Sequence, residues 1–176
     1  MRTRIALAAL GATLLAACAG TAARAPASVV AQVDLKRFMG DWYVIANIPT
    51  FLEKGAHNAV ESYRLDTHGS IAVTFTFNAG AFDGPTKTYT PRGFVLDSTN
   101  ARWGMRFVWP IQADYRISYL ASDYGLTVIG REARDYVWIM ARTPTIADAE
   151  YQRLVEFVKR EGYDVSKLER VPQRPR

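Results

Sequence analysis

The sequence has few of the residues that bind metals or perform nucleophilic catalysis. Its 176 residues include one cysteine, Cys18, and two histidines, His57 and His68. A single cysteine excludes an intramolecular disulfide framework. No Cys, His and acidic residues follow the spacing of a zinc site or of a catalytic triad. His57 lies near the start of a predicted strand and His68 in a predicted turn, so we expect no enzymatic activity, no metal site and no cofactor.

Long apolar runs and basic clusters are also missing. The longest apolar run, residues 5–17, is well short of the roughly 20 residues that span a bilayer. The net charge is +5, and removal of residues 1–17, which carry two arginines and no acid, would lower it to +3. The basic residues are spread along the chain rather than interleaved with aromatics, which argues against a nucleic-acid partner.

The N-terminus has the charge, apolar and small-residue order of a secretory signal peptide. Arg2 and Arg4 precede the apolar run, which ends in Leu15-Ala16-Ala17-Cys18. This box resembles a bacterial lipoprotein signal, which implies that Cys18 is acylated and becomes the mature N-terminus. A plain signal peptide and an N-terminal membrane anchor are the alternatives. Ala19 after the cysteine resembles the outer-membrane sorting pattern of Gram-negative bacteria, which implies a periplasm-facing protein anchored by its acyl chains.

Composition divides the rest of the chain. Residues 18–33 are rich in small residues and are expected to be a flexible tether. Residues 34–172 are expected to form one domain, and residues 173–176 a disordered tail.

The domain is expected to be mostly β. The clearest period-two pattern runs through residues 70–77, where Ile71, Val73, Phe75 and Phe77 share one face. Further strands are expected at 42–48, 57–65, 86–95, 103–109, 114–121, 125–130 and 136–142, with turn residues between them. Eight short strands in sequence predict an antiparallel up-and-down barrel, which has room inside for one small ligand.

One helix is expected after the strands. Thr145 is its predicted N-cap and Gly162 its stop. Between them an apolar stripe recurs at helical spacing, formed by Tyr151, Leu154, Val155 and Val158. We expect this stripe to pack on the outside of the barrel; a helix lying on a membrane is the alternative.

Three short segments in this order resemble the conserved regions of the lipocalin family. They are Gly40-Asp41-Trp42-Tyr43, Ser122-Asp123-Tyr124, and Arg142 at the end of the last strand. Residues 33–172, particularly 34–46, 51–55, 135–144 and 160–168, are most similar to the bacterial outer-membrane lipoprotein branch. The resemblance implies structural roles for Gly40, Trp42, Asp123, Tyr124 and Arg142, with Arg142 across the Trp42 indole at the closed end. The weakest stretch is 78–113.

The same resemblance implies a small hydrophobic ligand, a fatty acid or a lysophospholipid, and it also allows a homodimer. The predicted inward face that would meet the ligand is Val44, Ala46, Tyr63, Phe75, Phe77, Tyr89, Trp109, Tyr115 and Ile117. Each of these residues has plain core filling as its alternative. Lys54, Arg92, Arg106 and Arg116 are candidate partners for a lipid head group, with an exposed outer face as the alternative.

Two other functions stay open. A histidine inside the barrel could ligate haem, as in some lipocalins. Alternatively the barrel is a scaffold that recruits a protein through residues 50–56 and 78–86 without selective lipid binding.

Overall fold

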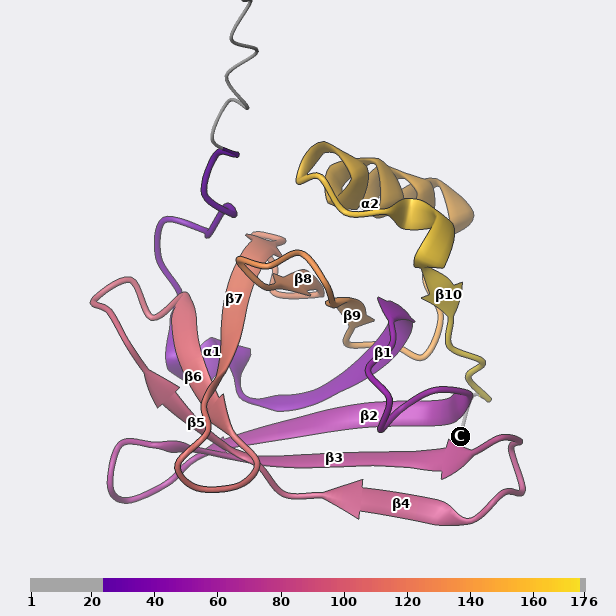
Figure 1. Ribbon diagram of the computed structural model, residues 1–176, viewed down its shortest axis with the longest axis horizontal. Helices are drawn as coiled ribbons and strands as arrows, with labels where there is room; N and C mark the ends of the chain where they lie inside the picture. Colours follow the sequence, from indigo (N-terminus) through magenta and orange to yellow (C-terminus); the bar gives the residue numbers. More distant parts are fainter. Residues whose placement is uncertain (1–23, 175–176) are drawn as a thin grey trace, which may run out of the picture.

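The computed structural model describes residues 24–174, whose strands form a closed antiparallel barrel (Figure 1). Apart from β4 and β5, each strand pairs with the next along the chain, and β9 pairs with β1 to close the ring. β4 and β5 both pair with β3 and together take one position, so the barrel has eight strand positions, as predicted. The strands are β1 (Gly40–Ile48), β2 (Ala56–Leu65), β3 (Ile71–Ala79), β4 (Thr86–Tyr89), β5 (Arg92–Val95), β6 (Arg102–Arg106), β7 (Ala113–Leu120), β8 (Leu126–Gly130) and β9 (Val137–Ala141).

Two of the predicted strands are interrupted or end early, and in each case a proline lies in the segment that leaves the sheet. The strand predicted at 86–95 is divided into β4 and β5 at Thr90-Pro91. Pro91 has no N–H for the ladder, although its carbonyl accepts from the Val73 amide. β6 stops at Arg106 rather than at 109, and residues 107–112, which include Pro110, form a loop.

The helix after the barrel is α2 (Asp148–Arg160). The prediction that Thr145 is its N-cap is wrong. The cap is Ala147, whose backbone is still extended, and no side chain accepts a hydrogen bond there. The predicted stop is confirmed, because Gly162 has φ +88° and its amide donates to the Lys159 carbonyl.

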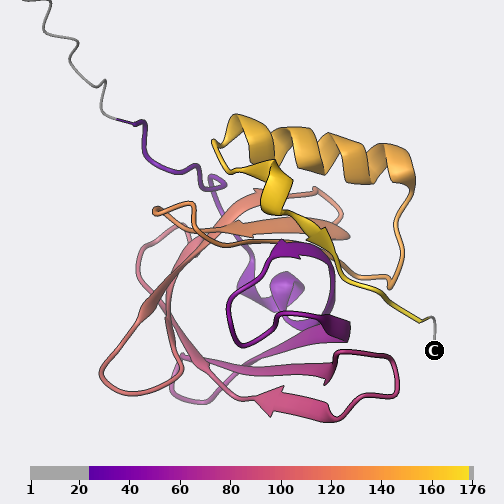
Figure 2. The same cartoon turned by 45° about the vertical axis from the view of Figure 1, so that its right-hand side comes forward.

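Two apolar cores lie on opposite sides of the sheet. The larger core fills the barrel and includes the fully buried Phe38, Trp42 and Trp103. The second lies between the barrel wall and α2, where Leu154 and Val158 are fully buried against β1, β8 and β9. Figures 1 and 2 show α2 lying over β8 and β9 outside the barrel, so its apolar stripe is already covered. Among residues 24–174 no helix has the length and apolar character needed to cross a bilayer.

Both ends of the described chain pack on the barrel. The Val30 amide donates to the Ile117 carbonyl at 2.9 Å, and the Val33 amide donates to the Thr99 carbonyl at 2.8 Å. The prediction of a flexible tether is therefore wrong for residues 27–33. The predicted disorder of the tail is wrong for Gln173, whose side-chain amide donates to the carbonyls of Val44 and Ala59.

The remaining elements complete this picture. They are α1 (Leu35–Phe38), η1 (Val165–Lys167) and β10 (Glu169–Arg170), which adds to β1. Among the described residues, all buried apolar side chains lie within 27–171. A chain that begins at Ala19 thus keeps every core contact that the structure describes.

Candidate functional site

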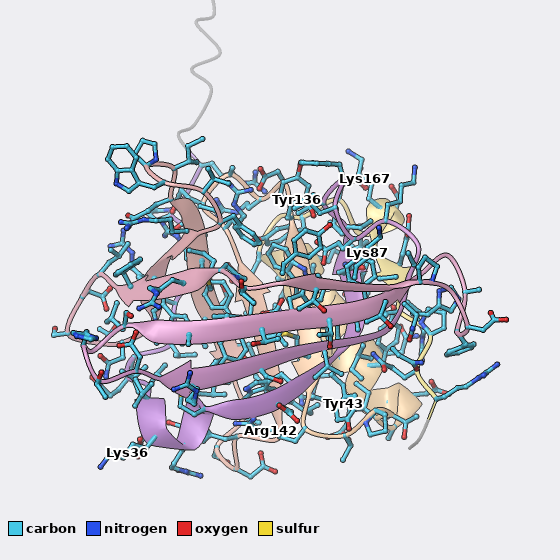
Figure 3. The ribbon with its side chains drawn as sticks, turned by 90° about the horizontal axis from the view of Figure 1, so that it is seen from below. Lys36, Tyr43, Lys87, Tyr136, Arg142 and Lys167 are labelled. Carbon is cyan, nitrogen blue, oxygen red and sulfur yellow. The ribbon has the colours of Figure 1, made fainter. Side chains whose placement is uncertain are left out.

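The barrel is closed at one end and open at the other. Figure 3 shows Lys36 and Arg142 at one end, and Tyr136 and Lys87 at the opposite end. At the first end α1 crosses beneath the strands, and Phe38 packs against Trp42 with ring centroids 5.0 Å apart. Figure 2 looks into the other end, where the β1–β2 loop lies across part of the opening.

Arg142 fastens α1 to the barrel. Its guanidinium carbon lies 3.8 Å from the centre of the Trp42 ring. Its nitrogens donate to the backbone carbonyls of Arg37, Phe38, Met39 and Asp41 at 2.8–2.9 Å. The carbonyls at a helix end lack partners within the helix, and Arg142 supplies them. Gly40 has φ +97°, and a Cβ there would lie 3.3 Å from the Arg142 Nη1.

The turn at 122–125 completes the closed end. Arg37 stacks on the Tyr124 ring at 4.0 Å and donates to the Ser122 carbonyl. The Tyr124 hydroxyl accepts from the Asp34 amide at 2.9 Å, and Asp123 accepts from the Gly125 amide. The three sequence segments therefore meet in one structural unit. Phe38 and Trp42 are fully buried within this unit and fill that end of the barrel.

A cavity of about 180 Å³ opens at the other end. Its walls are mostly apolar, with contributions from β3, β4, β6 and β7. Thr50, Leu52 and Glu53 of the β1–β2 loop close over it. The lining residues are Thr50, Phe51, Leu52, Glu53, Glu61, Val73, Phe75, Tyr89, Pro91, Met105, Phe107, Ala113, Asp114, Tyr115, Arg131, Tyr136 and Trp138.

A shallower groove of about 630 Å³ continues the cavity outward along the rim. The two share Phe51, Tyr89, Met105 and Phe107 among their lining residues. The inner cavity alone has room for only about six water-sized groups. A long acyl chain would therefore extend from the cavity into the groove, whose combined size suits a small-molecule site.

The predicted ligand residues do not all lie together. Phe75, Tyr89 and Tyr115 line the cavity. Tyr63 lies just beneath it and exchanges a hydrogen bond with Tyr115. Val44, Phe77 and Ile117 belong to the barrel core but are absent from the cavity lining, so they fill the core. Whether any of these residues contacts ligand stays a prediction.

Two predicted inward residues point elsewhere. Ala46 lies in the core beneath α2. The β1–β9 register shifts between Val44 and Ala46, and such a bulge turns the following side chains to the other face. Trp109 is 76% exposed because β6 ends before it and the loop carries it outward. The inward assignment is wrong for both residues.

The candidate head-group cations are occupied or lie away from the cavity. Arg116 pairs with Asp114 and Glu132, and Arg92 pairs with Asp66. Arg106 stacks on Phe94, and Lys54 is exposed outside the lining. The basic residue that does line the cavity is Arg131, which pairs with Asp135 at 3.0 Å.

Sequence reasoning missed the three acidic residues that line the cavity, Glu53, Glu61 and Asp114, of which the two glutamates have raised pKa values. Glu53 is almost fully buried, and its carboxylate accepts from the Thr50 amide and the Trp138 indole at 3.0 Å. Burial raises its pKa. Glu61 lines the deeper part of the cavity, and burial, reinforced by the Glu53 charge, raises its pKa to about 8. The Glu61 side chain is partly accessible, and the surface that it exposes faces the cavity. Glu61 has the same strand parity as Tyr63, so the alternation of β2 could have identified it.

The described residues contain no group of three His, Cys, Asp or Glu side chains arranged for a metal ion. His57 packs edge-on against Phe82 and His68 bonds within its own turn, so neither lies in the cavity.

Comparisons with known proteins agree with this architecture. The family model for a lipocalin-like domain matches residues 33–173. The chain is 32% identical to temperature-induced lipocalin-1 of Arabidopsis thaliana over 82% of both chains. It is 31% identical to the outer membrane lipoprotein Blc of Escherichia coli K12, over 92% of this chain and 91% of the relative.

Solved structures share the fold at lower identity. The cockroach allergen Per a 4 superposes with a TM-score of 0.63 at 19% identity, over 84% of this chain and 92% of the other. Insecticyanin from the tobacco hornworm Manduca sexta gives 0.62 at 17% identity, over 82% of each chain. With a barrel closed by Trp42 and Arg142, an opposite end open to an apolar cavity, and a family model that spans nearly the whole described chain, the protein belongs to the lipocalin family.

Proposed function

We propose that this protein is a non-enzymatic lipocalin, held in the cell envelope by an acylated Cys18, that stores or carries a fatty acid or lysophospholipid. The observation that carries the proposal is the apolar cavity, which is closed at one end and continues into a groove at the other. Burial of about fifteen methylenes would contribute on the order of 12 kcal/mol before the cost of association, so we expect micromolar affinity.

The rim of the opening supports exchange with a membrane. Phe51 is 87% exposed, and Val108 and Ile111 in the β6–β7 loop are 69% and 72% exposed. All three line the groove. Exposed apolar groups concentrated in one place are typical of a contact site. A lipid that leaves the cavity here would remain against apolar surface.

The first described residues, from Arg24 to Ala27, lie near this same end of the barrel. Arg134, in the β8–β9 loop, donates to the Ala25 carbonyl at 2.7 Å, and Ala27 lies against Glu132 of the same loop. That loop also places Arg131 at the cavity. Cys18 precedes Arg24 by six residues, which span at most about 20 Å when extended. An acylated Cys18 would thus hold the opening close to the bilayer.

Native mass spectrometry with lipid extraction tests ligand binding. A chain beginning at Ala19, purified from a bacterial host, is expected to carry a mass that matches a fatty acid or lysophospholipid. Phe75→Asp should lose that mass because it places a charge in the cavity wall. Phe94→Asp is the matched control, since Phe94 stacks on Arg106 and does not line the cavity. An empty barrel whose tryptophan fluorescence does not respond to added lipids would overturn the proposal and favour the protein-scaffold function.

Membrane attachment is tested separately. In a Gram-negative host, Cys18→Ser is expected to abolish incorporation of a labelled fatty acid into the full-length protein and to remove it from the outer-membrane fraction. Thr21→Ala, a small change just beyond the cysteine, should leave both unchanged. If Cys18→Ser still incorporates the label, Cys18 is not the acylated residue.

A further inference from the structure

The inner end of the cavity is polar although its walls are apolar. Glu61 on β2 lines the cavity, and the Tyr63 hydroxyl donates to its carboxyl group. The Tyr63 and Tyr115 hydroxyls lie 2.7 Å apart. Beneath them are the Tyr63, Trp103 and Phe38 rings of the closed end, with Trp103 stacked on Tyr115 at 5.0 Å. Three oxygen-bearing side chains therefore meet where a ligand would reach deepest.

No cation balances Glu61. Among residues 24–174 it takes part in no salt bridge, whereas Arg131, the cavity's own basic residue, pairs with Asp135. Glu53 is the next carboxyl group in the cavity, but its two oxygens already accept from Thr50 and Trp138. Tyr63 satisfies one oxygen of Glu61, and the carboxyl group still faces the cavity. A polar group in an apolar enclosure is costly unless a partner reaches it.

The electrostatics of the cavity disfavour an anion at this depth. Glu53 and Glu61 both line it, and Asp114 lies at its wall. A ligand carboxylate beside Glu61 would meet like charge or compete for the single Glu61 proton. An alkyl end would leave the carboxyl group without a further partner. A ligand hydroxyl or amine would donate to it instead.

We propose that Glu61, supported by Tyr63 and Tyr115, is a subsite that receives a hydrogen-bond donor, an amine or a hydroxyl, at the inner end of an otherwise apolar ligand. The inference rests on the proposed function, since it assumes that the cavity takes an apolar chain. It adds the orientation of the ligand: a carboxylate or phosphate, where present, stays at the mouth.

A ligand hydroxyl and a ligand amine differ in whether their binding releases a proton. A hydroxyl donates to the neutral carboxyl oxygen, and no proton leaves the complex. An ammonium group stabilises the Glu61 carboxylate, so the proton that Glu61 holds near neutral pH is released to solvent. Amine binding at pH 7 should therefore release about one proton, which calorimetry in buffers of different ionisation enthalpy measures.

Isothermal titration calorimetry with three ten-carbon probes tests the subsite. We expect 1-decanol and decylamine to bind the chain beginning at Ala19 at least tenfold more tightly than decanoate at pH 7. Glu61→Gln should weaken decylamine about tenfold and abolish its proton release, while decanol changes less than threefold because an amide oxygen still accepts. Tyr115→Phe, which keeps the ring, should reduce the amine preference without emptying the cavity.

Glu156→Gln is the matched control, because Glu156 is exposed on α2 and lies outside both the cavity and the groove. It should leave all three affinities and the proton release unchanged. Decanoate binding tightest, or equal affinities that Glu61→Gln does not alter, would overturn the subsite and leave the lipid carrier intact. Failure of all three probes and of a lysophospholipid to bind would instead overturn the carrier function, and the subsite with it.

Discussion

Arg142→Ala is expected to lower the free energy of unfolding by about 3–4 kcal/mol. The variant loses the hydrogen bonds from a cationic group to five backbone carbonyls and the contact with the Trp42 ring. Hydrogen bonds to charged groups contribute about 1.5–3 kcal/mol each when buried, and a cation–π contact about 0.5–2 kcal/mol. Arg142 is only partly buried, so water replaces some of these bonds and the total is well below their sum.

Urea unfolding at pH 7 measures this loss. Arg142→Lys keeps the charge but not the planar fork that reaches several carbonyls, so we expect about half of the full effect. Arg153→Ala is the control, since Arg153 also lies over an aromatic ring, Tyr119 at 5.2 Å, but on the exposed side of α2. It should cost about 0.5 kcal/mol or less. A loss below about 1 kcal/mol for Arg142→Ala would mean that Phe38 and Trp42 close the barrel through packing alone.

The closed end could be predicted through the resemblance of its short motifs to the lipocalin family, because its geometry depends on a few residues at fixed positions. Trp42 lies near the start of β1, Arg142 directly follows β9, and Gly40 lies where a side chain would meet the guanidinium group. This geometry requires a particular residue type at each of these positions, so it can be recognised from short motifs and their order among the strands. The eight strand positions followed from period-two alternation for the same reason.

The open end was less predictable because small backbone irregularities decide which side chains face inward. Alternation assigns Ala46 to the face of Val44, but the bulge between them reverses it. Alternation also extends β6 to Trp109, whereas the chain leaves the sheet after Arg106. Hydrophobic character was a misleading guide as well. Glu61 lies deep in the cavity, while Trp109 is exposed.

The second large effect is on the pH dependence of stability. Glu61 has a pKa of about 8 in the folded protein against an ordinary value of 4.5. Because the folded-state pKa is raised, its contribution to stability is fully present below about pH 4.5 and is lost as the pH rises through 8. A tenfold difference in proton affinity between the folded and unfolded chains corresponds to about 1.4 kcal/mol. After allowance for water in the cavity, we expect the free energy of unfolding to fall by about 2–3 kcal/mol between pH 5 and pH 9.

Other groups with shifted pKa values act in the same direction or outside this pH range. Glu53 also has a raised pKa and adds to the loss, whereas Tyr115, whose pKa is raised above its usual 10, ionises only at higher pH. Asp66 and Asp164 have lowered pKa values, so their contributions are lost only under acidic conditions. Over pH 5–9 the two buried glutamates therefore dominate.

Glu61→Gln is expected to remove most of this dependence, and to be more stable than the wild type by about 2–3 kcal/mol at pH 9. The glutamine side chain keeps the shape of Glu61 and one acceptor oxygen but never ionises. Removing the Glu61 charge also removes its repulsion of the Glu53 carboxylate. Urea unfolding at pH 5, 7 and 9 measures the stability of the wild type, of Glu61→Gln and of the control Glu156→Gln. The control is expected to follow the wild type. Parallel profiles for Glu61→Gln and wild type would show that Glu61 is charged and hydrated in the cavity. A stability gain together with a loss of amine affinity would instead identify Glu61 as a residue retained for ligand binding at the expense of the fold.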